Sequence, residues 1–362
     1  MSRPVTATIH ADALRHNLAS VRTHAPSSRV MAMVKADGYG HGLETVASAL
    51  RTADAFGVAA IADVRRIRAI GLEQPVLVLS GFDSPEDLEQ LRALRADSIV
   101  HHPAQLDMLE QADGEPIGCW LKVDTGMHRL GFAPAQVRQA HARLSAARGA
   151  AGDIVLMSHF ASSDEFEGAS ANSRQTRDQL QVFAEATAGL PGPRSLANSA
   201  AVLGWPGSHG DWVRPGGALY GMSVVAGKTG ADFGLRPAMT FATRLLAVNR
   251  IRRGERVGYS ATWETPEDMA IGVAAVGYGD GYPRLAPAGT PVLVNGAPAQ
   301  VVGRVSMDLV TIDLRGHPDA RAGDPVLLWG EGLPVERVAA AAGTIGYDLT
   351  CSITRRVDFL QG

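Results

Sequence analysis

The sequence predicts an α/β protein, with a (β/α)8 barrel of the TIM type over residues 10–230 and a β-strand-rich domain over residues 231–362. Three observations carry this prediction: eight short apolar runs before residue 222, segments of helical periodicity between most of them, and strand-like runs without long helices after about residue 230. Residues 1–9 have the pattern of a strand and are able to join the second domain.

The predicted barrel strands are the apolar runs at residues 30–34, 55–60, 76–80, 98–102, 119–125, 154–160, 195–200 and 212–221. Several of these runs lack polar alternation, which is typical of parallel strands that are buried on both faces. Eight such runs, most of them separated by helical segments, favour a closed barrel over an open sheet. No G-x-G-x-x-G pattern follows any of them, which argues against a dinucleotide-binding domain.

The segments between the runs have helical spacing and start signals. Leu43, Val46 and Leu50 follow the i, i+3, i+7 rule, and Ser84 followed by Pro85 indicates an N-cap and the first helical residue. Two further apolar stripes have the same spacing: Val137, Ala140 and Leu144, then Leu180, Phe183 and Ala184. We therefore expect helices at all four places.

The second domain shows a different pattern. Residues 227–234 have the composition of a linker, and six strand-like runs follow, punctuated by glycine, proline and asparagine. The Asn295-Gly296 pair predicts a tight hairpin turn. A single helix is expected at about residues 334–342.

Composition narrows the possible partners. The net charge of −3 argues against nucleic acid, and no apolar run approaches the roughly 18 residues that a membrane span needs. The N-terminus lacks a signal-peptide pattern, and the two cysteines, Cys119 and Cys351, exclude a disulfide framework, so a cytoplasmic location is expected. Cys/His zinc spacing is absent, so no metal is expected.

Charged residues end two of the predicted strands, where barrel active sites lie. Lys35 closes the first run and precedes the glycine-rich segment ADGYGHG, which suits a backbone packed against a ligand, although a surface lysine is the alternative. Lys122 and Asp124 lie towards the end of the fifth run, with Arg129 shortly after it. Strand alternation points Lys122 and Asp124 the same way, either into the barrel mouth or as a structural ion pair.

The last three barrel strands supply a second polar group. His159 ends the sixth run, with a buried structural histidine as the alternative reading, Asn198 and Ser199 lie in the seventh, and Arg214 and Gly216 lie in the eighth. Loops after strands 7 and 8 of such barrels commonly bind phosphate. A lysine on the first strand and a phosphate site across the last two is the layout that a pyridoxal 5'-phosphate (PLP) site needs.

Eight segments taken together resemble the alanine racemases, which are fold-type III PLP enzymes. The resemblance covers nearly the whole chain. It is specific because the segments are numerous and their order and spacing match those of the family. The segments are VKADGYGHG, KVDTGMHRLGF, HFASSDE, LANSA, RPGGALYG, VGYSATW, VGYGDGYPR and GRVSMD. In this family two bases on opposite faces of the α-carbon exchange its proton.

The resemblance implies roles for individual residues. Lys35 is similar to the lysine that carries PLP and acts as one base, and Tyr259 is similar to the second base, supplied by the other subunit of a homodimer. Arg214 resembles the arginine that contacts the pyridine nitrogen, with His159 hydrogen-bonded to it. The implied phosphate-binding set is Tyr39, Ser199, Gly216 and Tyr347, with Asn198 beside them.

Further residues are implied for the substrate. Arg129 resembles the arginine that reaches the PLP phenolic oxygen and the substrate carboxylate, and Lys122 matches a lysine that some members carbamylate. Met307 is implied to donate its backbone N–H to the carboxylate from the partner subunit, and Tyr278 to narrow the entrance, with Asp308 nearby. The chain departs from some relatives in having Ser306 for cysteine and His128 for glycine.

The leading hypothesis is therefore a cytoplasmic alanine racemase that interconverts L- and D-alanine, for peptidoglycan or for alanine catabolism. A broader racemase for serine or basic amino acids is the alternative on the same scaffold, and Tyr278 and Tyr347 favour alanine because they narrow the pocket. A related decarboxylase would need another second domain. Non-enzymatic single-barrel PLP-binding proteins end after the barrel, so the β-rich stretch from residue 231 argues against them.

Overall fold

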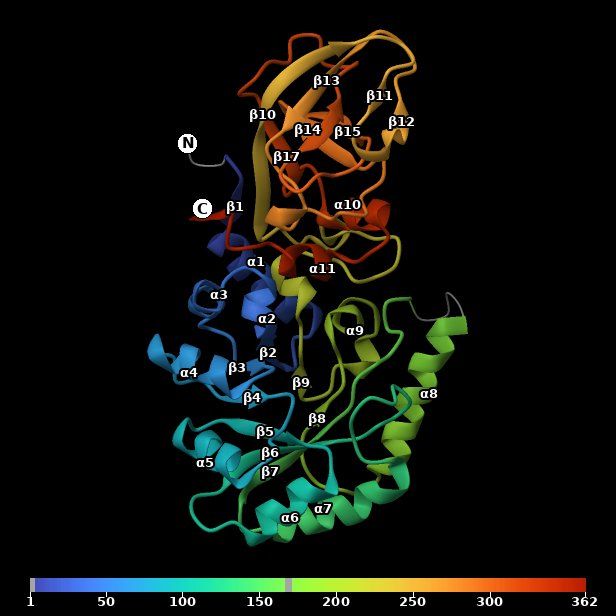
Figure 1. Cartoon of the computed structure of the whole chain (residues 1–362). Coiled ribbons are helices and arrows are strands. Elements are labelled where there is room, and N and C mark those ends of the chain that lie inside the picture. The colour runs from blue at the N-terminus through green and yellow to red at the C-terminus, as the bar shows by residue number, and fades with distance from the viewer. Residues whose placement is uncertain (1–3, 167–170) are drawn as a thin grey trace. The chain divides into compact units, whose positions relative to one another are not determined.

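The computed structural model describes residues 4–166 and 171–362. The chain divides into two compact units, which Figure 1 shows with their elements labelled. The barrel unit comprises Arg15–Leu219 and Ser223–Lys228. The sheet unit comprises the N-terminal segment up to Leu14, then Tyr220–Met222 and Thr229–Gly362.

Eight parallel strands close into a barrel, which confirms the predicted (β/α)8 fold. Each strand pairs with the next in sequence, and the last pairs with the first. The strands are β2 (Arg29–Met33), β3 (Ala55–Val58), β4 (Val76–Val78), β5 (Asp97–Val100), β6 (Ile117–Lys122), β7 (Ala150–Met157), β8 (Arg194–Ser195) and β9 (Trp212–Val213). The last two are much shorter than the runs that predicted them, because the chain turns away to form α9 and a 3-10 turn.

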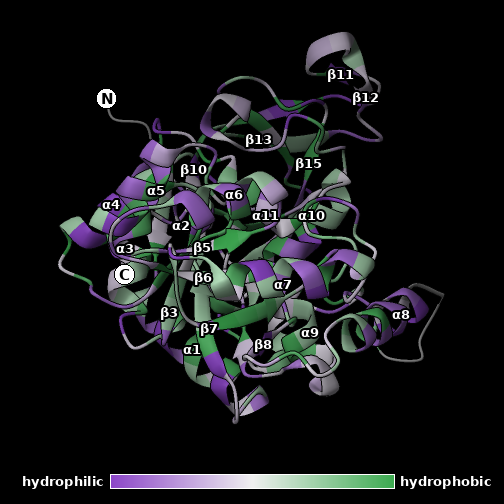
Figure 2. Cartoon of the chain, turned by 90° about the horizontal axis from the view of Figure 1, so that it is seen from below, coloured by the Kyte–Doolittle hydropathy of each residue, from purple (hydrophilic) through white to green (hydrophobic). Residues whose placement is uncertain are grey.

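Helices between these strands occupy the predicted positions. At the start of α5 the Ser84 hydroxyl accepts the Asp87 N–H at 3.1 Å, as the N-cap signal predicts. In Figure 2 the strands β5 to β7 are coloured mainly as hydrophobic, whereas α8 carries many hydrophilic residues. The helices are α1 (Ala11–His24), which begins in the sheet unit, α2 (Lys35–Tyr39), α3 (Leu43–Ala49), α4 (Ile61–Ala69), α5 (Pro85–Ala93), α6 (Pro103–Gln111), α7 (Val137–Ala146), α8 (Ala171–Ala186) and α9 (Ser199–Gly204).

The barrel interior is a packed apolar core. Inward side chains from successive strands meet there, and Trp120 and Trp212 lie with ring centroids 5.6 Å apart. Burying each large apolar side chain stabilises the fold by roughly 1.5–3 kcal/mol. The core therefore fixes the strand ends that carry the polar residues described below.

The second unit is built on an eight-stranded sheet in the order β13-β16-β15-β14-β17-β10-β1-β18. The N-terminal strand β1 pairs antiparallel with β10 and parallel with β18. Asn295 and Gly296, at φ 52° and 79°, form the predicted hairpin turn between β14 and β15. The strands are β1 (Thr6–Ile9), β10 (Met239–Ile251), β13 (Met269–Ala274), β14 (Pro291–Val294), β15 (Ala297–Val302), β16 (Val310–Asp313), β17 (Pro325–Trp329) and β18 (Asp358–Gln361), with a separate pair β11 (Arg256–Val257) and β12 (Trp263–Glu264).

Two helices accompany this sheet where the sequence predicted one. α10 (Val335–Ala342) lies at the predicted place, and α11 (Gly346–Cys351) follows it after a short turn. The single-helix prediction was wrong here, because six residues beginning with glycine are too short to show helical periodicity. Short 3-10 turns complete the described chain: η1 (Pro134–Gln136), η2 (Pro206–Ser208), η3 (Gly217–Tyr220), η4 (Gly230–Phe233), η5 (Tyr259–Ala261) and η6 (Tyr278–Asp280).

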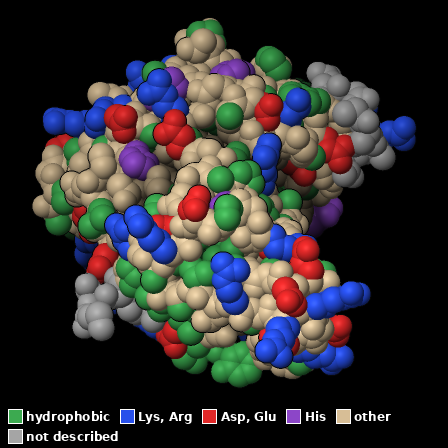
Figure 3. Space-filling view, turned by 90° about the horizontal axis from the view of Figure 1, so that it is seen from above, with side chains coloured by type: hydrophobic (Ala, Val, Ile, Leu, Met, Phe, Trp, Pro, Cys, Tyr) green, Lys and Arg blue, Asp and Glu red, His purple; other side chains and the backbone are tan. Residues whose placement is uncertain are grey.

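Two general properties bear on ligands. Within residues 4–166 and 171–362, no helix has both the length and the apolarity to cross a membrane, and no group of three or more His, Cys, Asp or Glu side chains is arranged to hold a metal ion. Figure 3 shows acidic and basic side chains interspersed over the face that it presents.

Candidate active site

The chain makes a left-handed turn directly after β2. Ala36, Asp37, Gly38 and Tyr39 all have φ between 53° and 62°, so the short helix α2 has the opposite hand to an ordinary α-helix. Each non-glycine residue in this conformation costs roughly 1–2 kcal/mol. Such strain persists only where surrounding contacts enforce it, and it concentrates at functional sites.

Side-chain contacts hold this turn in place. The Asp37 carboxylate accepts the backbone N–H of Leu43 at 3.1 Å and Arg66 Nη2 at 2.6 Å. A Cβ on Gly38 would lie 2.9 Å from Val46 Cγ2, so glycine is needed both for the positive φ and for this close packing. The turn therefore fixes both Lys35, at its start, and Tyr39, at its end.

At the end of β6, Lys122 is a buried lysine, with 7% of its surface exposed. Burial, reinforced by the positive charges of Arg214, Arg129 and Lys35, lowers its pKa to about 8. Among the described residues it makes no ion pair with Asp124, which instead accepts the N–H groups of Gly126 and His128 and closes its own turn. The structural ion-pair reading of these two residues is therefore wrong.

Arg214, directly after β9, is 3% exposed and is held on several sides. Its guanidinium donates to Ser195 Oγ at 2.6 Å, to the Ser158 carbonyl at 2.7 Å and to the Leu196 carbonyl at 3.2 Å. Burial lowers the pKa of Arg214 to about 9, so the guanidinium stays protonated at neutral pH. No carboxylate pairs with it within the described part of the chain.

His159 faces this guanidinium, with Nδ1 3.3 Å from Arg214 Nη2. Burial, reinforced by the charges of Arg214, Lys122, Arg129 and Lys35, lowers the pKa of His159 well below its ordinary value. The ring is therefore neutral at pH 7, and Nδ1 accepts a hydrogen from the arginine. His159 is thus part of the polar cluster and is not an isolated core histidine.

A buried polar network lies behind His159, and sequence reasoning missed it. Gln179 of α8 donates to the His159 carbonyl at 3.0 Å and to Thr125 Oγ1 at 3.1 Å, and Thr125 Oγ1 lies 2.8 Å from Ser158 Oγ. These residues lie in α8 and in the loops after β6 and β7, and none has a local sequence signal. Ser195 was also missed, although it stands at the start of a predicted strand run.

Three of the residues predicted to bind phosphate lie close together where β8 and β9 end. Ser199 Oγ accepts the N–H of Gly216 at 2.7 Å and that of Ala218 at 3.2 Å. A Cβ on Gly216 would lie 2.4 Å from the Tyr39 hydroxyl, so the phenol packs directly against this glycine. Asn198 caps α9 by accepting the Ala201 N–H at 3.0 Å. Tyr39, Ser199 and Gly216 thus meet at one end of the barrel.

The barrel ends therefore concentrate positive charge. Four basic side chains lie at or after the ends of three different strands, and all four act electrostatically on His159: Lys35, Lys122, Arg129 and Arg214. Hydroxyl groups and a close glycine stand at the same ends of the strands. Together these groups can bind an anionic ligand and hold it against Lys35.

The sheet unit holds the remaining predicted residues on its surface. Tyr259, Met307 and Tyr278 are exposed to 67%, 52% and 40%. After Tyr259 the backbone has positive φ at Ser260 and Ala261, which presents the tyrosine at a strained turn. Tyr347 lies in α11, half-buried, and its grouping with the phosphate set stays a prediction.

Comparisons with known proteins agree with this architecture. Residues 9–224 match the family model described as "Alanine racemase, N-terminal domain", and residues 238–360 match "Alanine racemase, C-terminal domain". Curated proteins named "Alanine racemase" from Nitrosococcus oceani and Shewanella sp. (strain MR-7) are 53% and 51% identical, each over 97% of both chains.

Solved structures are similar over the same length. The biosynthetic alanine racemase of Pseudomonas aeruginosa is 43% identical with a TM-score of 0.94, covering 99% of both chains. The alanine racemase of Acinetobacter baumannii is 36% identical with a TM-score of 0.91, covering 99% of this chain and all of that one. By its two matched domains and by relatives more than 50% identical along nearly its whole length, this chain belongs to the alanine racemase family.

Proposed function

We propose that this chain is a PLP-dependent alanine racemase that interconverts L- and D-alanine. The observation that carries the proposal is the buried guanidinium of Arg214, which has no carboxylate partner among the described residues and faces a neutral His159. A buried charge without a counter-ion is costly unless a ligand completes its environment. An arginine donates only, so it would meet a pyridine nitrogen that carries no proton.

The residues present fit PLP. The phosphate and phenolic oxygens of PLP are anionic, and Lys35, Lys122, Arg129 and Arg214 supply the opposing charge. Hydroxyl groups of Tyr39 and Ser199 stand beside Gly216, where a side chain would exclude close approach of a phosphate. When bound, PLP would withdraw electrons from the amino acid and so acidify its α-proton.

The chain's own groups would then move that proton. One base would remove the proton from one face of the α-carbon while the other delivers a proton to the opposite face, with Lys35 Nζ serving one face and Tyr259 Oη of the partner subunit the other. Arg129 and the Met307 N–H of the partner subunit would bind the substrate carboxylate. If Lys122 were carbamylated, as it is in some family members, its negative carbamate would orient the Arg129 guanidinium.

A homodimer is part of the proposal. Tyr259, Tyr278 and Met307 are exposed on the sheet unit, as residues that complete the site of a second subunit would be in a single chain. Tyr278 and Tyr347 would limit the side chain that the site accepts. The reaction would supply D-alanine for peptidoglycan or serve the catabolism of alanine. The enzyme would be cytoplasmic.

Cofactor attachment can be tested without ambiguity, because the chain holds three lysines, Lys35, Lys122 and Lys228. The purified protein should absorb near about 420 nm, and borohydride should fix the cofactor on the peptide that contains Lys35. Lys228 serves as the internal control, since it lies outside the cluster. A label on Lys122 or Lys228 would overturn the assignment.

The two-base assignment needs an exchange experiment. A racemase has an equilibrium constant of about 1, so steady-state kcat/KM must fall equally in both directions for any variant. Exchange of the α-proton with deuterated solvent separates the two faces. Tyr259→Phe should slow exchange from L-alanine by about 10²–10⁴ and slow exchange from D-alanine far less. Equal slowing would contradict the assignment.

Substrate choice is tested by racemisation of alanine, serine, lysine and arginine, each with and without added PLP. The narrow entrance that we assign to Tyr278 and Tyr347 predicts the highest kcat/KM for alanine. If serine or a basic amino acid is converted faster, the broader racemase is the correct reading. If the protein racemises none of these amino acids, the proposed function is refuted.

A further inference from the structure

Arg356 lies between α11 and β18 and reaches two separate segments of the sheet unit. Its Nη2 donates to Asp308 Oδ1 at 2.5 Å, and its Nε lies 3.4 Å from Asp280 Oδ1. Asp280 ends the 3-10 turn η6 that begins with Tyr278, and Asp308 follows Met307. One guanidinium therefore bridges the carboxylates of two segments, each of which carries a residue assigned above to the substrate site.

The same guanidinium is packed against the backbone of η6. A Cβ on Gly279 would lie 2.3 Å from Arg356 Nη1 and 3.0 Å from the Met307 carbonyl. Only glycine at this position leaves room for both groups. The Arg356 guanidinium is therefore closely packed against the backbone at Gly279, unlike a chance pairing of surface charges.

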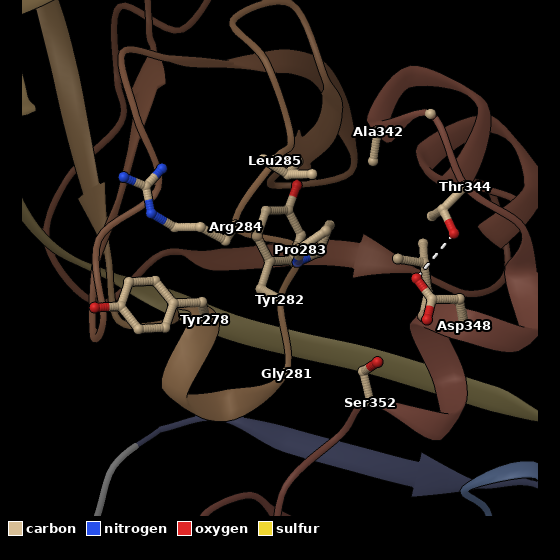
Figure 4. A pocket seen from close by; sticks show the side chains of 12 residues that line it. Tyr278, Gly281, Tyr282, Pro283, Arg284, Leu285, Ala342, Thr344, Asp348 and Ser352 are labelled. Atoms are coloured by element: carbon tan, nitrogen blue, oxygen red, sulfur yellow. Dashed lines mark hydrogen bonds between the residues drawn. The ribbon is translucent and has the colours of Figure 1, made fainter.

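Backbone hydrogen bonds tie the two segments at the same place. The Gly279 N–H donates to the Met307 carbonyl at 2.9 Å, and the Tyr278 N–H donates to the Ser306 carbonyl at 3.1 Å. Thr354, two residues before Arg356, donates its hydroxyl to the Gly279 carbonyl at 2.9 Å. Figure 4 shows Tyr278 at one side of a cavity of about 430 Å³, with its ring turned away from Tyr282.

The charges differ in their exposure. Asp280 is fully buried, with its Oδ2 accepting the Gly277 N–H at 3.0 Å, whereas Asp308 and Arg356 have side chains exposed to 48% and 39%. Removing Arg356 would leave the Asp280 carboxylate buried without this counter-charge. The η6 turn would then adjust, and Tyr278 and the 306–308 segment would move with it.

We propose that Arg356 is a positioning residue of the racemase, which fixes the relative placement of the Tyr278 ring and the Met307 N–H through its bridge between Asp280 and Asp308. The proposal rests on the proposed function, because it assigns both positioned groups to the substrate site of the partner subunit. Both groups contact substrate in the ground state, so loosening them weakens binding and side-chain discrimination more than turnover.

The experiment compares Arg356→Gln with Arg355→Gln in the full-length, PLP-loaded enzyme. Arg355 is the adjacent exposed arginine, and no hydrogen bond or ion pair joins it to any residue that the structure describes. Arg356→Gln should raise the KM for alanine about tenfold or more with a smaller loss of kcat, since contacts made equally in the ground state and the transition state affect KM rather than kcat. The kcat/KM ratio of serine to alanine should rise several-fold. Arg355→Gln should change neither quantity.

Conservative and alternative variants keep the test decisive. Arg356→Lys keeps the charge but cannot span both carboxylates, so its KM should fall between those of wild type and Arg356→Gln. If Arg356→Gln does not fold, Asp308→Asn removes one end of the bridge at a half-exposed position and should shift KM and the serine ratio in the same direction.

The outcomes separate the two proposals. A wild-type enzyme that does not bind PLP or racemise alanine refutes the proposed function whatever the variants do. An active wild type with an unchanged KM and serine ratio in Arg356→Gln refutes the positioning role. A variant that loses only thermal stability, with those two quantities unchanged, is equally a refutation, because a purely structural contact predicts that result.

Discussion

Replacing Ala36 by glycine tests the left-handed turn that carries the proposed catalytic lysine. Ala36 is exposed, with φ 54° and ψ 50°, so its methyl group contributes strain and little packing. Glycine removes roughly 1–2 kcal/mol of that strain and adds roughly 0.5–1 kcal/mol of unfolded-chain entropy. The net expectation is a stabilisation of about 0.5–1 kcal/mol.

Ala142 provides the matched control, because it is an exposed alanine inside the ordinary right-handed helix α7. The same substitution there should destabilise the protein by about 1 kcal/mol. The two variants therefore differ by about 1.5–2 kcal/mol with opposite signs, although each loses one exposed methyl group. Gly38→Ala should destabilise the protein by more than Ala142→Gly does, since the new methyl group meets both the positive φ and Val46 Cγ2 at 2.9 Å.

Urea denaturation of the cofactor-free protein measures all three variants, with the midpoint compared at an unchanged slope. Thermal unfolding should separate Ala36→Gly from Ala142→Gly by roughly 3–8 °C in a unit of this size. If Ala36→Gly lowers the midpoint as Ala142→Gly does, residues 36–39 do not form a left-handed turn in solution, and the reasoning fails.

Two further predictions concern the charge and the packing of the site. Gly216→Ala should weaken PLP binding about tenfold or more, because the new methyl group meets the Tyr39 hydroxyl at 2.4 Å, and Tyr39→Phe in the same chain should recover part of the loss in a PLP titration. Burial lowers the pKa of Lys122 from 10.5 to about 8, so between about pH 8 and 10.5 the unfolded state binds more protons and the stability of the cofactor-free protein should rise with pH. Below pH 8 the buried charge costs up to about 3 kcal/mol of stability, so Lys122→Met should be more stable than wild type at pH 7. Its stability should also not increase between about pH 8 and 10.5. If the variant and wild type depend on pH in the same way, the pKa of Lys122 is not lowered as described.

The barrel could be predicted from the sequence because its pattern is local. Continuous apolar runs mark strands buried on both faces, and helical spacing between them implies parallel crossovers. Lys35 and Arg214 became candidates by the same logic, since each closes or follows a strand at the end where barrel sites lie. The tight turn at Asn295 needed only two residues to be recognised.

Other features have no local signal. The glycines near Lys35 indicated conformational freedom but did not predict a left-handed turn. The handedness of this turn depends on contacts with Arg66 and Val46, which lie further along the chain. Two-residue strands β8 and β9 are fixed by neighbouring strands, and their runs predicted longer ones. The helix α11 was too short for its period to be visible.

By itself, the sequence determined the barrel, the strand-rich second domain and the placement of Lys35 and Arg214 at strand ends, because these follow from periodicity along the chain. Only the tertiary structure decided which polar groups meet. Ser195, Ser158 and Gln179 support the Arg214–His159 pair from different elements, and Arg356 is indistinguishable in sequence from its neighbour Arg355. Contacts between residues far apart in the chain arise from packing and are not encoded in any local pattern.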